Sequence, residues 1–499
     1  MDTINYLVLG FSTILTVTNL IASFSGILVG TFIGVLPGLG PTATMAILLP
    51  LTFGMDATPA IIMIAGIYYG SQYGGSTTSI LVNIPGEVGS IVTCLDGYQM
   101  ARQGRAGAAL GMSAMGSFIG GTVGVIGLMF LAPFLGEMAA NLGPADIFSF
   151  IVFGLMMVSS IGKGSLAKAL IMATLGIFVS TIGRESMQGF SRFTLGSLVL
   201  SDGVGIVPAA VGMFGLTELL GNIEEMAKQE VFKTKLRDLF PSLKDWKASF
   251  WPVIRGTFVG FFFGIVPGAG TLITTFFSYG LEKRLSKHPE TFGTGAIEGV
   301  AGPETANNAS TAGSMVPLLV LGVPPHQVMA MLMAAFIIHG IQPSPYLIAD
   351  YPNLFWGLIA SMYLGNVMLL LLNLPLIGVW VQLLKVPYRL LFPLIIIFCF
   401  VGVYSVNNNI YDLLIMILFG LIFYILRKID YEPGPFILAL VLGPMMETNF
   451  RQSMKIAGGD PAIFIQRPYS AFFLALVVVI LVISLFFKRG KRKGAEDWT

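Results

Sequence analysis

The chain has 499 residues, of which 55% are hydrophobic and only 11% are charged, and its formal net charge is +2. With a mean hydropathy of +0.82, it has too little polar surface to cover a soluble globule, so a water-soluble protein of ordinary composition is excluded. The composition predicts an integral membrane protein.

Apolar stretches with almost no charge occur along the whole chain. They cover residues 6–36, 106–135, 148–161, 355–384, 390–406 and 471–487. Several exceed the roughly 20 residues that cross a bilayer core of about 30 Å. None alternates apolar and polar residues as the strands of a membrane barrel do. We therefore expect an all-α polytopic integral membrane protein with roughly 11–14 spans or half-spans.

The first distinctive segment is GILVGTFIGVLPGLGP, residues 26–41. Gly26, Gly30 and Gly34 recur at every fourth residue and so share one face of a helix. Small residues at this spacing allow two membrane helices to approach closely. We expect this face to pack against a neighbouring helix.

The same segment ends in a proline and two glycines. Pro37 lacks a backbone donor and disfavours the α conformation of the residue before it, and Gly38 and Gly40 permit backbone shapes closed to other residues. The helix is therefore expected to end here. In lipid a broken helix persists only where protein or a polar cavity covers its free backbone groups. The free N–H groups of a following half-helix suit an anion, and unwound carbonyl groups can hold Na⁺. A structural kink is the alternative interpretation.

Small polar residues follow in SQYGGSTTSILVNIPGE, residues 71–87, before an apolar run and an Ile-Pro pair. Hydroxyl and amide groups can bind a carboxylate or a cation without a fixed charge. Helix capping by such residues is the other possibility.

The longest polar interval, residues 222–247, divides the chain into two halves. We predict a first membrane repeat at 1–221, a cytoplasmic linker at 222–247, a second repeat at 248–430, further membrane segments at 431–487 and a basic cytoplasmic tail at 488–499. The tail follows an apolar stretch and begins with KRGKRK, which places the C-terminus in the cytoplasm. Nucleic acid binding is the less favoured interpretation of that cluster, and we expect none.

The second half repeats the distinctive segments of the first. GTFVGFFFGIVPGAG, residues 256–270, aligns without a gap on residues 26–40 with eight identical positions of fifteen, and STAGSMVPLLVLGVPP, residues 310–325, corresponds to residues 71–87. Internal repeats of this kind are common in secondary transporters.

Charges in the loops indicate how the two copies are oriented. Residues 51–60 contain no Lys or Arg, whereas the matching residues 281–290 contain three; residues 96–107 contain two, whereas the matching residues 339–352 contain none. By the positive-inside rule, corresponding loops lie on opposite sides of the membrane. The sequence therefore predicts two inverted-topology repeats with broken helices or re-entrant hairpins.

We expect both breaks and both polar clusters to meet near the membrane midplane and to bind a carboxylate together with Na⁺. The candidate substrate- and ion-binding residues are Pro37, Gly38, Gly40, Pro41, Thr42, Ser76, Thr77, Thr78, Asn83, Pro85, Gly86, Pro267, Gly268, Gly270, Thr271, Asn307, Asn308, Ser310, Thr311 and Pro324. Glu87 and Glu304 lie near these motifs as Na⁺ ligands, loop caps or partners of an arginine, and the sequence does not rank these roles. A β-branched residue at Gly38 or Gly268 is expected to abolish uptake without preventing membrane insertion.

Enzymatic function has no support in the motifs. The sequence contains no HExxH, GxSxG, CxxC or Walker P-loop pattern, and its three histidines show no metal-ligand spacing. We expect no catalytic residues, no cofactor and no metal beyond transported Na⁺.

Taken together, the motifs resemble the large membrane subunit of the tripartite tricarboxylate transporters over nearly the whole chain. The segments that carry the resemblance are residues 34–53, 74–87, 96–110, 264–270, 299–324, 339–345 and 442–454. One departure is VPPHQ, residues 323–327, where the family usually has a Pro-Gly pair; Pro325 removes the backbone N–H at that position.

The resemblance implies a permease of the bacterial inner membrane that takes up a di- or tricarboxylate such as citrate. It implies cation symport, usually with Na⁺, by alternating access. The implied partners are a small membrane subunit and a periplasmic solute-binding protein that delivers the substrate. A passive channel or scaffold, or a carrier for another organic anion, is the alternative. The particular carboxylate, the ion stoichiometry and the oligomeric state are not encoded in these motifs.

Overall fold

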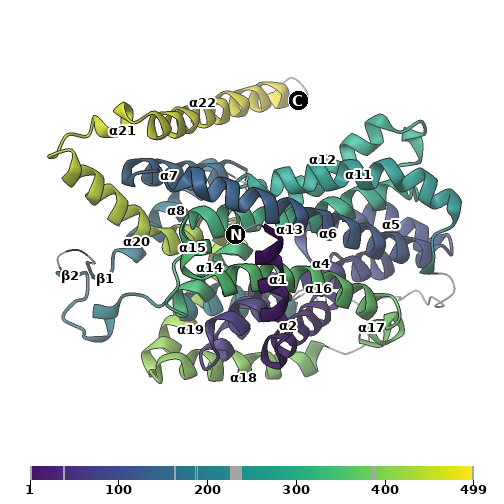
Figure 1. The fold of residues 1–499 in the computed structure, drawn as a ribbon, viewed down its shortest axis with the longest axis horizontal. Helices are drawn as coiled ribbons and strands as arrows, with labels where there is room; N and C mark the ends of the chain where they lie inside the picture. Colours follow the sequence, from purple (N-terminus) through teal and green to yellow (C-terminus); the bar gives the residue numbers. More distant parts are fainter. Residues whose placement is uncertain are drawn as a thin grey trace.

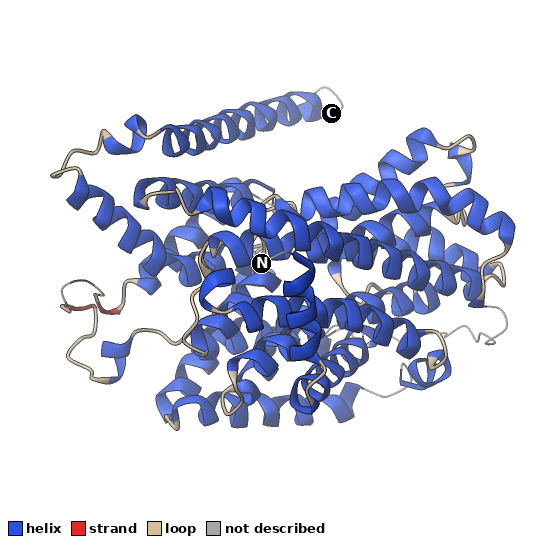
Figure 2. Ribbon diagram, viewed as in Figure 1, coloured by secondary structure: helices blue, strands red, loops and turns tan. Residues whose placement is uncertain are grey.

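The computed structural model describes residues 3–36, 40–161, 165–185, 187, 189–224, 239–383 and 388–496. These residues form helices almost throughout, with one two-stranded antiparallel hairpin (Figure 2). Up to the central polar interval the elements are α1 (Thr3–Ile14), α2 (Val17–Val35), α3 (Pro41–Leu48), η1 (Leu49–Thr52), α4 (Ala57–Val82), η2 (Val88–Ile91), α5 (Thr93–Arg102), α6 (Ala106–Ala139), α7 (Pro144–Ile161), α8 (Leu166–Ser180), β1 (Gly183–Arg184), β2 (Ser191–Arg192), η3 (Val199–Asp202), α9 (Ile206–Ala210), the π-helical η4 (Val211–Leu216) and α10 (Thr217–Glu224).

After that interval the chain continues as a second set of helices. They are α11 (Leu243–Ile265), α12 (Gly270–Leu285), η6 (Pro289–Thr291), α13 (Glu298–Leu321), α14 (Gln327–Ile338), α15 (Leu347–Asp350), α16 (Pro352–Asn373), α17 (Ile377–Leu383), α18 (Tyr388–Asn407), α19 (Ile410–Lys428), α20 (Pro433–Ile456), α21 (Ile463–Gln466) and α22 (Pro468–Glu496). In Figure 1, α22 lies along one side of the helical body, against α7.

Among the described residues, five helices are long and apolar enough to cross a membrane: α2, α6, α11, α16 and α19. Eight shorter apolar helices accompany them. With 34 residues, α6 is about 51 Å long at 1.5 Å per residue, more than a bilayer core requires at normal incidence. The expectation of an all-helical protein with several membrane spans is confirmed.

Both predicted helix breaks are present. The first lies between the end of α2 at Val35 and the start of α3 at Pro41, and the second between the end of α11 at Ile265 and the start of α12 at Gly270. Each following helix has a threonine that donates back to the glycine at its start, Thr44 to Gly40 O at 3.0 Å and Thr274 to Gly270 O at 2.7 Å. This hydrogen bond is therefore repeated in the two halves, although Gly40 is extended with φ −72° and Gly270 is left-handed with φ 55°.

The glycine faces pack as predicted. A Cβ at Gly26, Gly30 or Gly34 would overlap the backbone carbonyl of a residue on α4, the last of these being Ser71. In the second half, a Cβ at Gly256, Gly260 or Gly264 would overlap carbonyl groups of α13 in the same register, the last being Ser310. Only glycine permits this backbone-to-backbone contact.

Helices α4 and α13 lie at the centre of the molecule and are buried along most of their length. Both end in a left-handed residue, Asn83 with φ 61° and Gly322 with φ 65°. Because these caps follow Ser71 and Ser310 at the same distance along the chain, the matched register extends to the helix ends. The loop after α4 therefore places Glu87 at the position that His326 occupies after α13.

The loops that carry basic residues meet at one end of the molecule, here called the basic end. Arg105 forms an ion pair with Asp245 at 2.5 Å. Asp96, which is completely buried, accepts hydrogen bonds from the backbone N–H groups of residues 293, 295 and 296 at 2.7–2.8 Å and from Tyr279 Oη at 2.9 Å. Asp96 thus ties α5 of the first half to the second half.

The two loops without basic residues, 51–60 and 339–352, meet at a second contact. His339 Nε2 lies 3.4 Å from Thr52 Oγ1, and residues 57–58 line one cavity together with residues 339–341 and 350–354. Loops of the two halves are therefore paired at this second contact as they are at the basic end.

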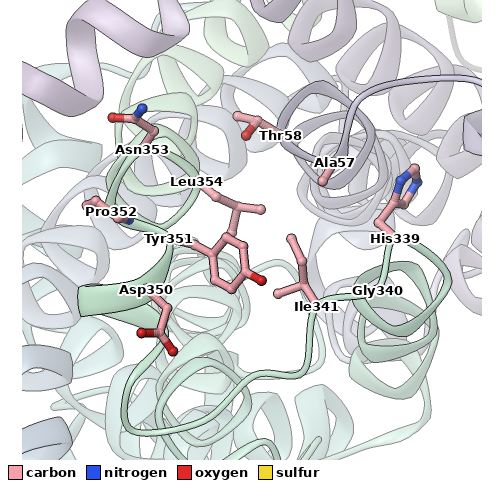
Figure 3. Close-up of a pocket in the computed structure, with 10 residues that line it drawn as sticks. All are labelled: Ala57, Thr58, His339, Gly340, Ile341, Asp350, Tyr351, Pro352, Asn353 and Leu354. Atoms are coloured by element: carbon pink, nitrogen blue, oxygen red, sulfur yellow. The ribbon is translucent and has the colours of Figure 1, made fainter.

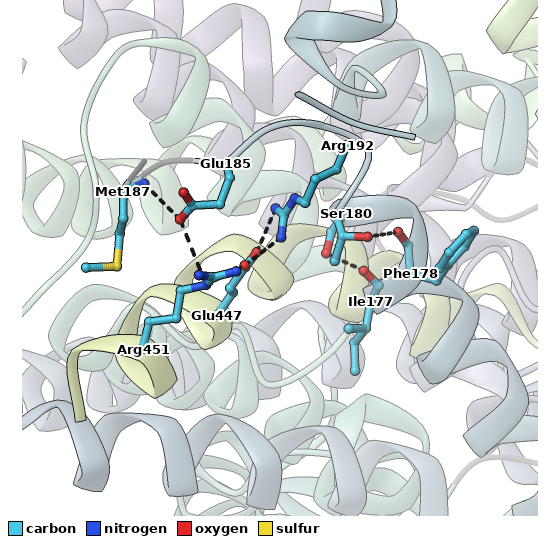
Figure 4. A network of polar contacts seen from close by, with 9 residues as sticks. Ile177, Phe178, Ser180, Glu185, Met187, Arg192, Glu447 and Arg451 are labelled. Carbon is cyan, nitrogen blue, oxygen red and sulfur yellow. Dashed lines mark hydrogen bonds and ion pairs between the residues drawn. The ribbon is translucent and has the colours of Figure 1, made fainter. Parts of the chain in front are cut away.

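A polar network holds the β-hairpin to α20 (Figure 4). The Arg192 guanidinium contacts both carboxylate oxygens of Glu447 at 2.7 and 2.9 Å, and Arg451 lies 2.8 Å from Glu447 and 3.9 Å from Glu185. Arg192 and Arg451 hold the pKa of Glu447 below its usual value, although partial burial acts in the opposite direction. Its contribution to stability is therefore complete above the ordinary glutamate pKa and is lost as pH falls through the lowered value.

Candidate functional site

Two buried glutamates lie at the centre of a cluster of polar side chains, here called the two-carboxyl cluster: Gln72, Ser76, Glu87, Thr93, Ser113, Ser117, Glu304, Asn307 and Asn308. Its members come from α4, the loop after α4, α5, α6 and α13. Both halves of the chain contribute, so the cluster exists only in the folded protein.

The carboxyl group of Glu304 contacts hydroxyl groups. Ser76 Oγ lies 2.6 Å and Ser113 Oγ 2.9 Å from Glu304 Oε2, and Thr93 donates to Oε1. The Glu304 side chain is 1% exposed. Position 304 faces α4 and α6 because α13 packs against both helices.

The carboxyl group of Glu87 contacts N–H groups instead. The backbone N–H of Gly89 donates to Oε2 at 2.6 Å, and Asn307 Nδ2 donates to Oε1 at 2.8 Å. The Gln72 amide, with its nitrogen turned toward Glu87, reaches both oxygens at 2.9–3.0 Å. Glu87 also accepts at the start of η2, where it forms a capping box with Ser90. The loop-cap role considered for Glu87 is therefore present.

Neither glutamate has a basic partner among the residues that the structure describes. A buried carboxylate without a counter-charge is costly, about 2.5–3.5 kcal/mol or more at the centre of a membrane helix. Asn307 Oδ1 is also buried and unpaired within the described part of the chain. Two carboxyls and an unpaired amide oxygen form a donor set that suits a monovalent cation or a proton. The arginine-partner role of both glutamates is thereby disfavoured.

A matching polar pair lies one helical turn before Gln72 on α4. Tyr68 Oη is 3.4 Å from His326 Nε2. In the matched register of the two halves, Tyr68 of α4 corresponds to Asn307 of α13. Glu87, in the loop after α4, corresponds to His326, in the loop after α13. The first half therefore provides an acidic group where the second half provides an imidazole. The sequence contained both residues but gave no sign that they face each other.

Other predicted residues have mainly structural contacts. Thr78 Oγ1 donates to Val35 O at 2.7 Å, close to the first break, and a Cβ at Gly86 would overlap Gly34 O. Ser310 and Thr311 donate to Asn307 O within α13. Thr42 is buried and Thr271 is half-buried. Pro41, Asn83, Pro85, Pro267, Gly270 and Pro324 lie at the helix ends and loops described above, and Pro37 and Gly38 lie outside the described residues.

Each break lies against the loop that follows the central helix of its own half. At the second break the Gly268 N–H donates to Pro325 O at 2.8 Å, so Pro325 takes part through its carbonyl group although it lacks an N–H. Gly268 has φ +82°, and a Cβ there would meet the backbone of Met157 and Val158. A structural requirement for glycine at this position is therefore established independently of transport.

We predict that alanine lowers thermal stability at the second break but not at the first. Gly268→Ala should lower thermal stability, because it strains a left-handed residue and forces α7 away. Gly40→Ala should leave stability unchanged, since Gly40 has φ −72° and open space around its Cβ. Fluorescence size-exclusion melting of both variants measures this difference. Equal melting temperatures for Gly268→Ala and the unmodified protein would show that the break tolerates a side chain.

A cavity of about 360 Å³ opens away from the two-carboxyl cluster, between the start of α4, the loop after α14 and the start of α16 (Figure 3). It is lined by Ala57, Thr58, His339, Gly340, Ile341, Asp350, Tyr351, Pro352, Asn353 and Leu354. None of the predicted site residues lines it. We assign it no role in substrate binding.

Sequence reasoning missed the partners that surround the glutamates: Gln72, Thr93, Ser113 and Ser117. Ser113 and Ser117 are four residues apart in the glycine-rich α6, a spacing that places both on one helical face. That pattern could have indicated a polar stripe. Nothing in the sequence indicated that the stripe faces Glu304, which lies more than 180 positions later.

Comparison with known proteins gives a consistent match. The model of the family described as the tripartite tricarboxylate transporter TctA family matches residues 20–438. The chain is 48% identical over 501 residues, covering 100% of both chains, to an uncharacterized 52.8 kDa protein in the TAR-I ttuC' 3'region of Agrobacterium vitis. It is 50% identical over 226 residues to an uncharacterized protein in the TAR-II ttuC' 3'region of the same organism, covering 45% of this chain and 93% of that one. No solved structure matches the chain.

Proposed function

Because the chain belongs to the tripartite tricarboxylate transporter TctA family, we propose that it is the permease subunit of a binding-protein-dependent secondary transporter. It takes up a di- or tricarboxylate resembling citrate by symport with a cation, Na⁺. The observation that carries this proposal is the two-carboxyl cluster, in which both halves of the chain surround buried acidic groups that have no basic partner among the described residues. Such groups within a membrane protein are typical of ion pathways.

Glu87 and Asn307 form the proposed Na⁺ site. Three kinds of N–H donor surround the Glu87 carboxyl, and N–H groups stabilise the ionised form because they donate and cannot accept. Asn307 Oδ1 adds a neutral oxygen without a partner in the described structure. The loop after α4 supplies backbone carbonyl groups, which are common Na⁺ ligands in transporters.

The substrate site is proposed at the two helix breaks and their half-helices, α3 and α12. A half-helix N-terminus attracts anionic groups. Each half-helix contacts the segment that follows the central helix of the other half, α12 with η2 and α3 with α14. A carboxylate bound at either break would therefore contact elements of both halves.

An inverted repeat with alternating access would relate the two halves. The shared register of the glycine faces, the matching left-handed caps and the paired loops support it. In this arrangement the basic end and the C-terminal tail face the cytoplasm of a bacterium, and the protein lies in the inner membrane. The half that carries one break then moves relative to the half that carries the other.

The proposed partners are a small membrane subunit and a periplasmic solute-binding protein that delivers the carboxylate. A passive channel or scaffold is the competing function, as is a carrier for another organic anion. A channel would not require two related helix breaks that are covered by neighbouring segments of the protein.

Uptake of labelled carboxylate into vesicles that contain all three subunits tests the proposal. We expect saturable accumulation that requires an inward Na⁺ gradient and that stops when an ionophore collapses the gradient. Parallel vesicles without the solute-binding protein measure the dependence on delivery. Uptake that persists unchanged without Na⁺ and without a proton gradient would contradict cation coupling, and recovery of a chemically altered substrate would indicate an enzyme.

A further inference from the structure

The two glutamates of the cluster differ in the chemistry of their partners. All contacts to the Glu304 carboxyl come from hydroxyl groups, of Ser76, Thr93 and Ser113. A hydroxyl group can donate or accept a hydrogen bond, whereas the N–H groups around Glu87 can only donate. A protonated Glu304 could therefore donate to a neighbouring hydroxyl oxygen. A proton on Glu87 would instead point at an N–H group that cannot accept it.

Ser76 shows how the proton would be accommodated. Its hydroxyl carries one hydrogen but has two acceptors within reach, Gln72 O at 3.0 Å and Glu304 Oε2 at 2.6 Å. If Glu304 is protonated, its O–H donates to Ser76 Oγ and Ser76 donates to Gln72 O. Each of the two hydrogens then has its own acceptor, whereas with an ionised Glu304 the single hydrogen of Ser76 is shared between Gln72 O and Oε2.

Several titratable groups face Glu304 from the surrounding elements. They are Tyr73 on α4, Glu87 in the loop after α4 and Cys94 on α5. Glu282 of α12 lies beside Gly302, two positions before Glu304 on α13. Arg255 lies 2.5 Å from Glu282 and is already paired with it. The neighbours of Glu304 therefore add negative charge or none, and this disfavours a second carboxylate.

A small cavity lies next to Ser113, one of the hydroxyl partners of this carboxyl group. Its volume is about 10 Å³, and its polar lining residues include Tyr73, Thr77, Ser113 and Asn373. Ser113 thus contacts both the cavity and Glu304 Oε2. A space of roughly this size holds one water molecule when polar partners are present.

Two of the lining groups lack a partner in the described structure, Tyr73 Oη and Asn373 Oδ1. Tyr73 is 3% and Asn373 5% exposed. Buried polar atoms without partners are rare and commonly mark a water molecule. The lining residues Leu110 and Ile377 belong to an apolar cluster with Met100, close to Arg102 and Arg105, so the cavity lies toward the basic end.

We propose that Glu304 is a proton-binding site, protonated in this conformation, and that it exchanges its proton through Ser113 and a water molecule in the cavity lined by Tyr73 and Asn373. The two-carboxyl cluster then carries one negative charge, on Glu87. In the proposed symport, on which this consequence rests, a single Na⁺ neutralises it.

Infrared spectroscopy of the purified chain in lipid nanodiscs at neutral pH tests the protonation without measuring transport. The C=O stretch of a protonated carboxyl group should be present in the unmodified protein, lost in Glu304→Gln and retained in Glu87→Gln. Glu298→Gln, on the same helix, is the matched control and should keep the band. An unchanged band in Glu304→Gln, or its loss in Glu87→Gln instead, would overturn the assignment.

Hydrogen–deuterium exchange of the same band tests the route. Ser113→Ala should slow the exchange about tenfold or more, since it removes the hydroxyl between the carboxyl and the cavity. Ser361→Ala, at a buried serine on α16 that donates to Leu358 O and lies outside the two-carboxyl cluster, should leave the rate unchanged. Equal rates for both variants would exclude the route. Because neither experiment measures uptake, a failed transport assay would contradict the proposed function and leave the proton site standing.

Discussion

Replacing Glu87 with glutamine is expected to reduce Na⁺-dependent carboxylate uptake at least about a hundredfold. The substitution keeps the shape of the side chain but removes the one charge that the proposed Na⁺ site provides. Removing one member of a buried charge pair typically costs on the order of 3–5 kcal/mol. Initial uptake rates in vesicles, at matched amounts of folded permease, measure the effect.

Glu304→Gln is the comparison that makes this result specific. An amide mimics a protonated carboxyl, with an N–H group to donate to Ser76 or Ser113 and an oxygen to accept from Thr93. We therefore expect Glu304→Gln to retain uptake within about fivefold and to keep its Na⁺ dependence, in contrast to Glu87→Gln. Unimpaired uptake by Glu87→Gln would remove Glu87 from the ion site.

Asp96→Ala is expected to destabilise the folded protein by about 3 kcal/mol or more. The substitution leaves Tyr279 Oη and three backbone N–H groups without their acceptor, and the N–H of Ala296 is buried. An unpaired buried donor costs roughly 1–3 kcal/mol. The melting temperature in detergent should fall by about 3 °C or more.

Asp96→Asn is the matched variant at the same position. Its amide oxygen can still accept from the three N–H groups, and its nitrogen can donate to Tyr279 Oη. We expect a clearly smaller fall in melting temperature than for alanine. Equal melting temperatures for the two variants would mean that the hydrogen bonds to Asp96 contribute little to the junction between the halves.

Local patterns were sufficient to predict the helix breaks and the glycine faces. Proline followed by glycine acts on the conformation of the chain at that point, and a glycine at every fourth residue determines how closely another helix can approach. Both effects depend on neighbours in the sequence. The structure confirms them at Val35 and Ile265, where the helices end, and at Gly34 and Gly264, where they pack.

The central helices were harder to predict. The segments around residues 71–87 and 299–324 read as small polar runs, yet they form part of the long helices α4 and α13. Glycine, serine and threonine have weak helix propensity, so tertiary packing decides the outcome here. The close contact of each glycine face with α4 or α13 supplies that packing.

The same reason explains why the roles of Glu87 and Glu304 could not be ranked from the sequence. Both glutamates lie among small residues and prolines in the sequence. The groups that contact their carboxyls differ, and folding brings those groups together. Ser76 and Glu304 are 228 positions apart, and Asn307 and Glu87 are 220 apart. Only the folded structure shows hydroxyl groups around one glutamate and N–H groups around the other.

The proposed charge of the cluster also bears on the energy available for uptake. If two net positive charges enter in each cycle, a membrane potential of 100 mV supplies about 4.6 kcal/mol. This corresponds to roughly a thousandfold accumulation or somewhat more. The cations that enter must then outnumber the negative charges of the carboxylate.

Simultaneous measurement of Na⁺ and carboxylate fluxes in the same vesicles tests the central claim most directly. With the small membrane subunit and the solute-binding protein present, we expect each carboxylate to enter with a fixed number of Na⁺ ions, and both fluxes to stop together in Glu87→Gln. Carboxylate that equilibrates across the membrane without any accompanying Na⁺ flux would contradict Na⁺ symport at the two-carboxyl cluster.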